Sequence, residues 1–117
     1  MPFIRIAVSP GFDERTVQEL GERVHQSMVE TIDISPADRF QIVTRHAASE
    51  MIWDRTFPDV QRSDSVAFVE ITLVAGRSDE KKRALYGAIA RNVEPLGIRA
   101  ADILVVLTET SRSNFSW

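Results

Sequence analysis

The sequence predicts an α/β fold built from two tandem strand–helix–strand (βαβ) units within one 117-residue domain. Three observations predict it. Apolar strand-like runs and helical patterns alternate twice, on either side of an irregular stretch at residues 46–65. An offset of 64 residues aligns 34–38 with 98–102 and Ile42 with Val106, which indicates a weak internal repeat. The composition, 44% hydrophobic and 26% charged, is ordinary for a globular protein.

The first unit covers about residues 2–45. Residues 3–8 predict a strand and residues 9–11 a turn. Asp13 is a typical cap for a helix over 14–32, where apolar residues recur at spacings of three and four. Gly21 within that helix costs up to about 1 kcal/mol relative to alanine, which a close approach of helix and sheet would explain. Residues 40–44 predict the second strand.

The second unit covers about residues 66–109. Residues 66–74 predict the clearest strand, with alternate residues apolar. After a turn at Gly76, Ser78 caps a helix whose expected buried stripe is Leu85, Ala88, Ile89 and Val93. Residues 103–107 predict a last strand, apolar enough to be buried on both faces. In the irregular stretch, residues 51–53 predict a short strand, and Trp53 and Phe57 are expected to serve packing.

Two right-handed βαβ units make one four-stranded mixed sheet with both helices on one face. The opposite face carries apolar residues, Val66 and Phe68 among them, that this chain leaves uncovered. Association of subunits is the simplest cover, so we expect an oligomer. Residues 110–117 are polar apart from Phe115 and Trp117, and we expect this tail to close over a neighbour's pocket.

Composition excludes several classes of function. The chain has no cysteine, which rules out disulfides, thiolate nucleophiles and zinc–thiolate sites, and two histidines are too few for a histidine-rich metal site. A net charge of −3 without a basic run argues against a nucleic-acid partner. No apolar stretch is long enough to span a membrane, and a signal peptide is not recognisable. The expected location is the cytoplasm.

Pro2 is the residue that is most clearly suited to acid–base chemistry. Removal of Met1, which a small second residue permits, leaves Pro2 with a free secondary amine. An α-amino group titrates near pH ~7.7–8.0, so this nitrogen can exchange a proton at neutral pH without a metal or cofactor. The apolar residues that follow would fix the ring at the end of a buried strand. The alternative is that Pro2 is only a tolerated second residue.

Three motifs resemble the tautomerase superfamily, in particular its malonate semialdehyde decarboxylase-like group. Residues 38–43 (Asp-Arg-Phe-Gln-Ile-Val) are similar to that group's Asp-Arg-Tyr-Gln-Ile-Val segment, and residues 76–78 to the superfamily's arginine-bearing turn. Residues 109–117 resemble its tail, with the two aromatic residues exchanged. The resemblance implies the trimeric fold of the tautomerases and of macrophage migration inhibitory factor. It also implies Pro2 as catalytic amine, Asp38 as its carboxylate partner and Arg77 as the anchor of a substrate carboxylate.

The resemblance extends to substrate-binding residues, with one departure. Ala75 stands where the decarboxylase pattern has a first arginine, which puts decarboxylation in question because one arginine orients a 3-oxo acid without polarising it. His25 lies where related cis-3-chloroacrylic acid dehalogenases place a carboxylate-binding histidine, although it can equally be polar packing. Phe115 and Trp117 correspond to pocket walls, or they only seal an interface. Arg39 is expected to pair with an acid.

Three functions remain open at this point. The first is a cofactor-independent, 4-oxalocrotonate tautomerase-like enzyme acting on small 2-oxo or dicarboxylic acids, with Pro2 as base and Arg77 as anchor. The second is decarboxylation or hydration with a cationic Pro2 next to Asp38. The third is a non-catalytic trimeric binding protein. A neighbouring negative charge raises the pKa of an amine and apolar burial lowers it, so the first two alternatives differ in the pKa of one nitrogen.

Overall fold

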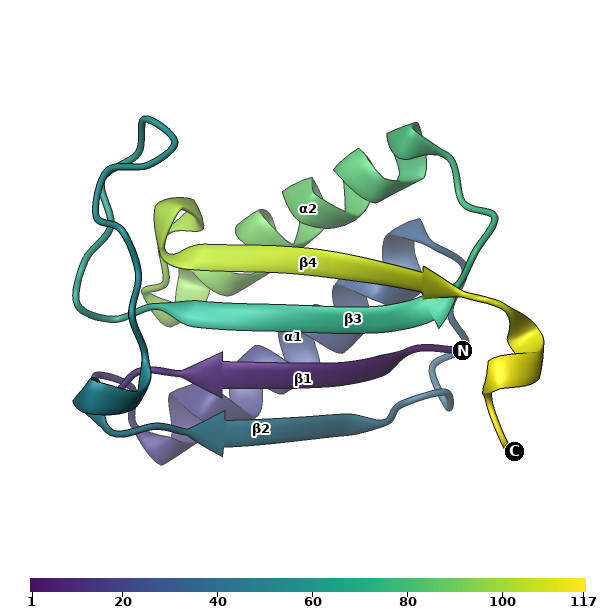
Figure 1. Cartoon of the computed structure of the whole chain (residues 1–117), viewed down its shortest axis with the longest axis horizontal. Coiled ribbons are helices and arrows are strands. Elements are labelled where there is room, and N and C mark those ends of the chain that lie inside the picture. The colour runs from purple at the N-terminus through teal and green to yellow at the C-terminus, as the bar shows by residue number, and fades with distance from the viewer.

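A computed structural model describes residues 1–117 and contains one four-stranded sheet with two helices on one face (Figure 1). The strands and helices are β1 Phe3–Val8, α1 Glu14–Thr31, β2 Gln41–Arg45, β3 Ala67–Val74, α2 Asp79–Val93 and β4 Ile103–Thr110. Short 3₁₀ turns lie at η1 Ala48–Glu50, η2 Glu94–Leu96, η3 Ala100–Asp102 and η4 Arg112–Asn114. No helix is both long enough and apolar enough to cross a membrane.

The sheet has the strand order β2-β1-β3-β4. β1 pairs in parallel with β2, and β3 pairs in parallel with β4, as two βαβ units require. The units meet at the centre, where β1 and β3 run antiparallel with Ile4 opposite Ile71 and Ile6 opposite Val69. This register confirms the mixed sheet and places the start of β1 beside the end of β3.

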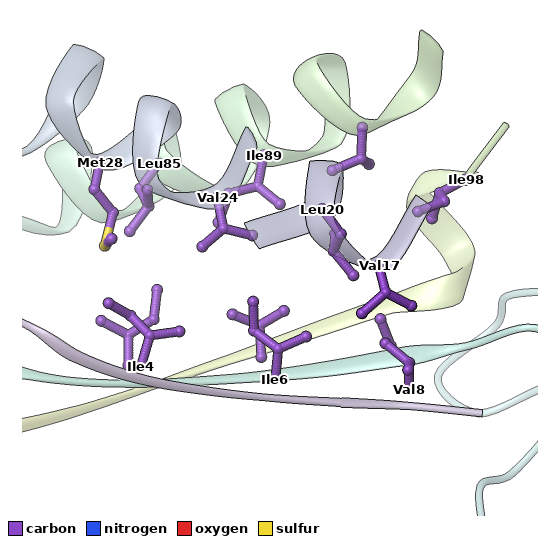
Figure 2. Packing of buried hydrophobic residues seen from close by; sticks show 14 of the residues in the cluster. Ile4, Ile6, Val8, Val17, Leu20, Val24, Met28, Leu85, Ile89 and Ile98 are labelled. Carbon is purple, nitrogen blue, oxygen red and sulfur yellow. The ribbon is translucent and has the colours of Figure 1, made fainter. Parts of the chain in front are cut away.

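The hydrophobic core lies between the sheet and the helices (Figure 2). Ile4, Ile6 and Val8 point from β1 toward the helices, because alternate residues of a strand share a face. The apolar stripes of both helices meet them, and the side chains that share this layer are Val17, Leu20, Val24, Met28, Leu85, Ile89 and Ile98. Asp13 accepts a hydrogen bond from the Thr16 amide and Ser78 accepts one from the Lys81 amide, so both expected helix caps are confirmed.

Several local expectations are wrong. Residues 51–53 form no strand and follow the 3₁₀ turn η1 as irregular chain. β4 extends to Thr110 and is not buried on both faces: one face is partly buried against the core, and on the other Leu104 and Val106 are each 47% exposed. Val66 is buried rather than part of the uncovered face, and Phe57 is 72% exposed rather than packed. Periodicity and hydrophobicity alone do not distinguish a strand covered by its own chain from one covered by a neighbour.

The face of the sheet opposite the helices, here called the open face, has no cover within the chain (Figure 1). Large apolar side chains occupy all four strands of this face, namely Phe3, Ile42, Phe68, Leu104 and Val106. Arg5 and Glu70 are direct cross-strand partners at its centre, and both are exposed. An uncovered sheet face with exposed apolar side chains on its strands is typical of an interface between subunits.

Gly21 marks the place where α1 approaches the edge strand β2. The Gln41 side chain donates a hydrogen bond to the Gly21 carbonyl at 2.9 Å, and a Cβ at position 21 would lie 2.9 Å from Gln41 Oε1. Gln41 in turn accepts a hydrogen bond from Arg39, which is paired with Glu22 at 2.9 Å, as expected for Arg39. The glycine is explained by this contact.

Substitution of Gly21 by alanine tests that explanation in a double-mutant cycle with Gln41→Ala. We expect Gly21→Ala alone to gain little stability, because the new methyl group displaces the Gln41 amide. In the Gln41→Ala background the same change should stabilise the protein by about 1 kcal/mol, the ordinary helix-propensity gain. Urea unfolding of the four proteins measures both values. An equal gain in the two backgrounds would contradict the contact.

Candidate active site at the amino-terminal end of the sheet

One end of the sheet gathers segments that are far apart in the sequence. Figure 1 shows the N-terminus, the arrowheads of β3 and β4, the loop before β2 and the C-terminal tail at the same end. The antiparallel pairing of β1 with β3 causes this arrangement, because it sets the first residues of β1 beside the last residues of β3. The residues predicted to be functional, apart from His25 on α1, come from these segments.

Met1, Pro2 and Asp38 lie together. The terminal amine of Met1 forms an ion pair with Asp38 Oδ2 at 3.1 Å, and the Asp38 side chain is only 18% exposed. Pro2 is buried. The Ile4 amide donates to the Phe40 carbonyl at 3.0 Å, which ties the loop carrying Asp38 to the start of β1. The carboxylate of Asp38 therefore faces the amino end of the chain and has no other side-chain partner.

Arg77 lies at the same end, in the turn between β3 and α2. Its Nε donates to the Ile32 carbonyl at the end of α1, and its Nη1 donates to the Val74 carbonyl at the end of β3, both at 3.0 Å. Nη2 donates to no protein atom. The guanidinium is thus held in place by backbone carbonyls, but none of its hydrogen bonds reaches Pro2 or Asp38.

Two carboxylates near Arg77 are neutralised by lysines. Lys82 pairs with Glu109 at 2.8 Å, which raises the pKa of Lys82 and lowers the pKa of Glu109. Lys81 pairs with Asp33, and that hydrogen bond lowers the pKa of Asp33. Arg77 itself has no carboxylate partner within the chain. Its charge also helps to lower the pKa of Asp33 and of Glu109, and it lies next to the amino end of α2, where helix N–H groups also favour anions.

His25 is packed beneath the loop that carries Asp38. Its ring is 92% buried, since 8% is exposed, and Nε2 lies 2.9 Å from the carbonyl oxygen of Pro36. A carbonyl only accepts, so Nε2 carries the proton in this contact. Nδ1 is buried and has no hydrogen-bond partner. In this structure His25 supports the loop and is not brought together with Arg77.

The C-terminal tail places an aromatic cluster at the same end. Phe115 and Trp117 stack with ring centroids 4.9 Å apart, and Trp117 also contacts Phe40 at 5.7 Å. Phe40 immediately precedes β2 and is 50% exposed. The cluster holds the tail of β4 against the start of β2, across the end of the sheet. Sequence reasoning identified Phe115 and Trp117 but missed Phe40, whose position two residues after Asp38 was the available signal.

A pocket lies at the opposite end of the sheet and was not foreseen. This pocket of about 500 Å³ is lined by the β1–α1 turn, the segment entering β3 and residues 48–55. Met51 and Trp53 contribute its apolar wall. No predicted site residue lines it.

Comparison with known proteins identifies the family. The profile of a family described as "Tautomerase enzyme" matches residues 38–117, and a second profile with the same description matches residues 2–53. The protein called probable tautomerase YusQ of Bacillus subtilis (strain 168) is 33% identical over 118 residues, spanning 100% of this chain and 93% of that protein. Probable tautomerase YrdN of the same strain is 29% identical, spanning 100% and 91%.

Solved structures agree with this result. A malonate semialdehyde decarboxylase designated FG41, inhibited by 3-bromopropiolate, superposes with a TM-score of 0.93 at 30% identity, covering 98% of this chain and 88% of that one. A fused 4-OT described as a symmetric trimer gives a TM-score of 0.77 at 25% identity, covering 95% and 87%. Sequence profiles, a curated relative and the fold all lead to one assignment. The chain belongs to the tautomerase family.

Proposed function

We propose that this protein is a cofactor-independent tautomerase of small 2-oxo or dicarboxylic acids. Pro2, exposed as the terminal residue by removal of Met1, moves the proton, Asp38 sets the charge of its amine, and Arg77 anchors a substrate carboxylate. The observation that carries the proposal is the position of Asp38, whose carboxylate lies at the amino end of the chain, 3.1 Å from the Met1 amine, at the end of the sheet where Arg77 also lies.

The chemistry follows from the properties of these groups. A neutral Pro2 amine takes a proton from an enol hydroxyl or from carbon next to a carbonyl, and the resulting ammonium returns it to a different atom of the same substrate. The reaction therefore transfers a proton within the substrate and leaves the enzyme unchanged. Burial of the ring in the end of β1 holds the nitrogen in one direction, which a flexible side chain would not do.

Arg77 supports substrate orientation. The two carbonyl contacts at Ile32 and Val74 hold its guanidinium, so little further side-chain entropy is lost when an anion binds. Its Nη2 edge is available for a carboxylate, to which arginine donates through two parallel hydrogen bonds. Lys81 and Lys82 occupy the nearby Asp33 and Glu109, which would otherwise compete with the substrate.

We further propose a homotrimer, in which subunits cover each other's open face. The apolar side chains on all four strands support this assembly, as does the trimer described for the similar fused 4-OT.

Decarboxylation or hydration of a 3-oxo acid is the second candidate. It is favoured by the position of the Asp38 carboxylate at the amino end of the chain, beside the Met1 amine, and by the similarity to malonate semialdehyde decarboxylases. A carboxylate beside an amine raises the pKa of that amine, and a cationic Pro2 acts as an acid. A single arginine, with Ala75 in place of a second, argues for tautomerisation instead.

The pKa of the Pro2 amine separates these candidates. We expect ¹⁵N NMR titration of processed protein, verified by intact mass, to show a Pro2 pKa near neutrality. Asp38→Asn should lower that pKa, because the variant removes the negative charge that favours the ammonium form. The tautomerase then loses activity as the pH falls through the Pro2 pKa, since protonation removes the base.

Three other outcomes would change this assignment. A wild-type pKa well above that of an ordinary terminal amine, with activity lost as the pH rises through it, supports the decarboxylase alternative. A pKa unaffected by Asp38→Asn contradicts the assigned partner. Retention of Met1 in the natively produced protein leaves Pro2 with an amide nitrogen, which cannot exchange a proton. That result supports a non-catalytic trimeric binding protein.

A further inference from the structure

The internal repeat gives the candidate active site a counterpart at the opposite end of the sheet. The strand order β2-β1-β3-β4 is symmetric about the central pair, so each half contributes the same elements in opposite directions. The helix caps Asp13 and Ser78 correspond, and so do the 3₁₀ turns η1 and η4, each of which follows the outer strand of its half. The same 64-residue offset that aligns η1 with η4 aligns Trp53 with Trp117 and Asp38 with Asp102.

The 500 Å³ pocket lies at this opposite end of the sheet. It is lined by Gly11 in the turn after β1, as Gly76 lies in the turn after β3, and by Ser65 just before β3. Trp53 closes it from the tail of β2, as Trp117 lies in the tail of β4. The two ends of the sheet are therefore built from equivalent segments.

At this end of the sheet, next to the pocket lining, a residue of the chain itself occupies the place between the carboxylate and the tryptophan. Ser63 donates its amide to Asp102 Oδ1 at 2.7 Å and its hydroxyl to Asp102 Oδ2 at 2.9 Å. The Trp53 indole N–H donates to the Ser63 carbonyl at 3.2 Å. One residue thus presents donors to the carboxylate and an acceptor to the indole.

At the candidate site the equivalent groups lack such an internal bridge. Asp38 contacts only the Met1 amine, which the proposed function removes, and the Trp117 indole N–H donates to no protein atom. A Cβ on Gly11 would collide with Ser65 Oγ at 2.1 Å, whereas nothing lies within 4 Å of the same point on Gly76. Stacking on Phe115 and contact with Phe40 nevertheless hold the Trp117 ring at this end of the sheet.

We propose that the Trp117 indole N–H is a substrate hydrogen-bond donor, so that a bound oxo acid bridges Asp38 and Trp117 as Ser63 bridges Asp102 and Trp53. The substrate hydroxyl faces Asp38, and a carbonyl or carboxylate oxygen accepts from Trp117. The inference rests on the proposed function, and it makes Trp117 a determinant of specificity for oxygen-bearing substrates rather than an apolar wall alone.

The protein has two tryptophans, so an ¹H–¹⁵N spectrum shows two indole signals, which Trp53→Phe and Trp117→Phe assign. The probe is 3-phenylpropanoate, a non-reacting carboxylate, titrated into processed wild-type protein. We expect the Trp117 indole signal to shift downfield with saturation while the Trp53 signal stays in place. This readout needs no turnover, so a shift at Trp117 in an inactive protein supports the hydrogen bond and sinks only the tautomerase proposal.

Kinetics supply the matched comparison. Trp117→Phe keeps an aromatic ring but loses the donor, and we expect kcat/KM for an enol–keto substrate to fall about three- to tenfold, the net value of one hydrogen bond. Trp53→Phe, the control, should lower thermal stability and leave kcat/KM unchanged. Any one of three results overturns the proposal. The first is a wild-type kcat/KM in Trp117→Phe, and the second is an equal loss of kcat/KM in Trp53→Phe. The third is a Trp117 indole signal that does not respond to the probe at saturation or at millimolar concentration.

Discussion

Pro2→Ala is expected to lower kcat/KM for enol–keto conversion by about 10²–10⁴-fold, the usual contribution of a general acid or base. The alanine amine rotates freely about its N–Cα bond, so its lone pair is no longer held toward the substrate, whereas the proline ring fixes that direction. The measurement is steady-state kinetics on protein whose processing is verified by intact mass.

A variant with one extra residue before Pro2 is the matched control. It keeps the ring but converts its nitrogen to an amide, which cannot exchange a proton at neutral pH. We expect it to be at least as impaired as Pro2→Ala, while thermal unfolding of both variants matches the wild type. Wild-type activity in either variant would exclude Pro2 as the proton carrier.

Arg77→Ala is expected to raise KM and to lower kcat/KM by about ten- to thirtyfold. Loss of one partner of a buried charge pair costs about 2–5 kcal/mol, and partial exposure of Arg77 places the effect at or below the lower end. Arg77→Lys keeps the charge, but the ammonium cannot hold two backbone carbonyls and also grip a carboxylate, so we expect only partial recovery. Substrate-saturation kinetics distinguish the two variants.

Arg77→Ala also removes two contacts to backbone carbonyls and should reduce stability, so a control is needed for that effect. Arg23 donates to the Asn92 carbonyl at 3.1 Å, linking α1 to the last turn of α2 without contributing to the site. Arg23→Ala should therefore lower the unfolding temperature while KM stays unchanged. If KM rises equally in both variants, Arg77 acts through the fold and does not anchor substrate.

The candidate site was only partly accessible to sequence reasoning. Asp38 and Arg77 were identified because they stand in recognisable motifs, and the cap at Ser78 located the turn that carries Arg77. The contact of Arg77 with the Ile32 carbonyl and the lysine partners of Asp33 and Glu109 were not predicted, since each joins segments distant in sequence. The missed contribution of Phe40 has the same origin, because its partner Trp117 lies at the far end of the chain.

Strand and helix periods, caps and the repeat were sufficient to define the two βαβ units, because these are local patterns that each segment carries in its own side chains. The pairing of β1 with its neighbouring strands is not a local pattern, because it joins segments that are far apart in the sequence. The parallel pairing of β1 with β2 brings the amino end of the chain to Asp38, and the antiparallel pairing of β1 with β3 brings it to the end of β3. Residues 51–53 line a pocket instead of forming a strand, since the hydrophobic cover a segment finds depends on what the folded chain places beside it.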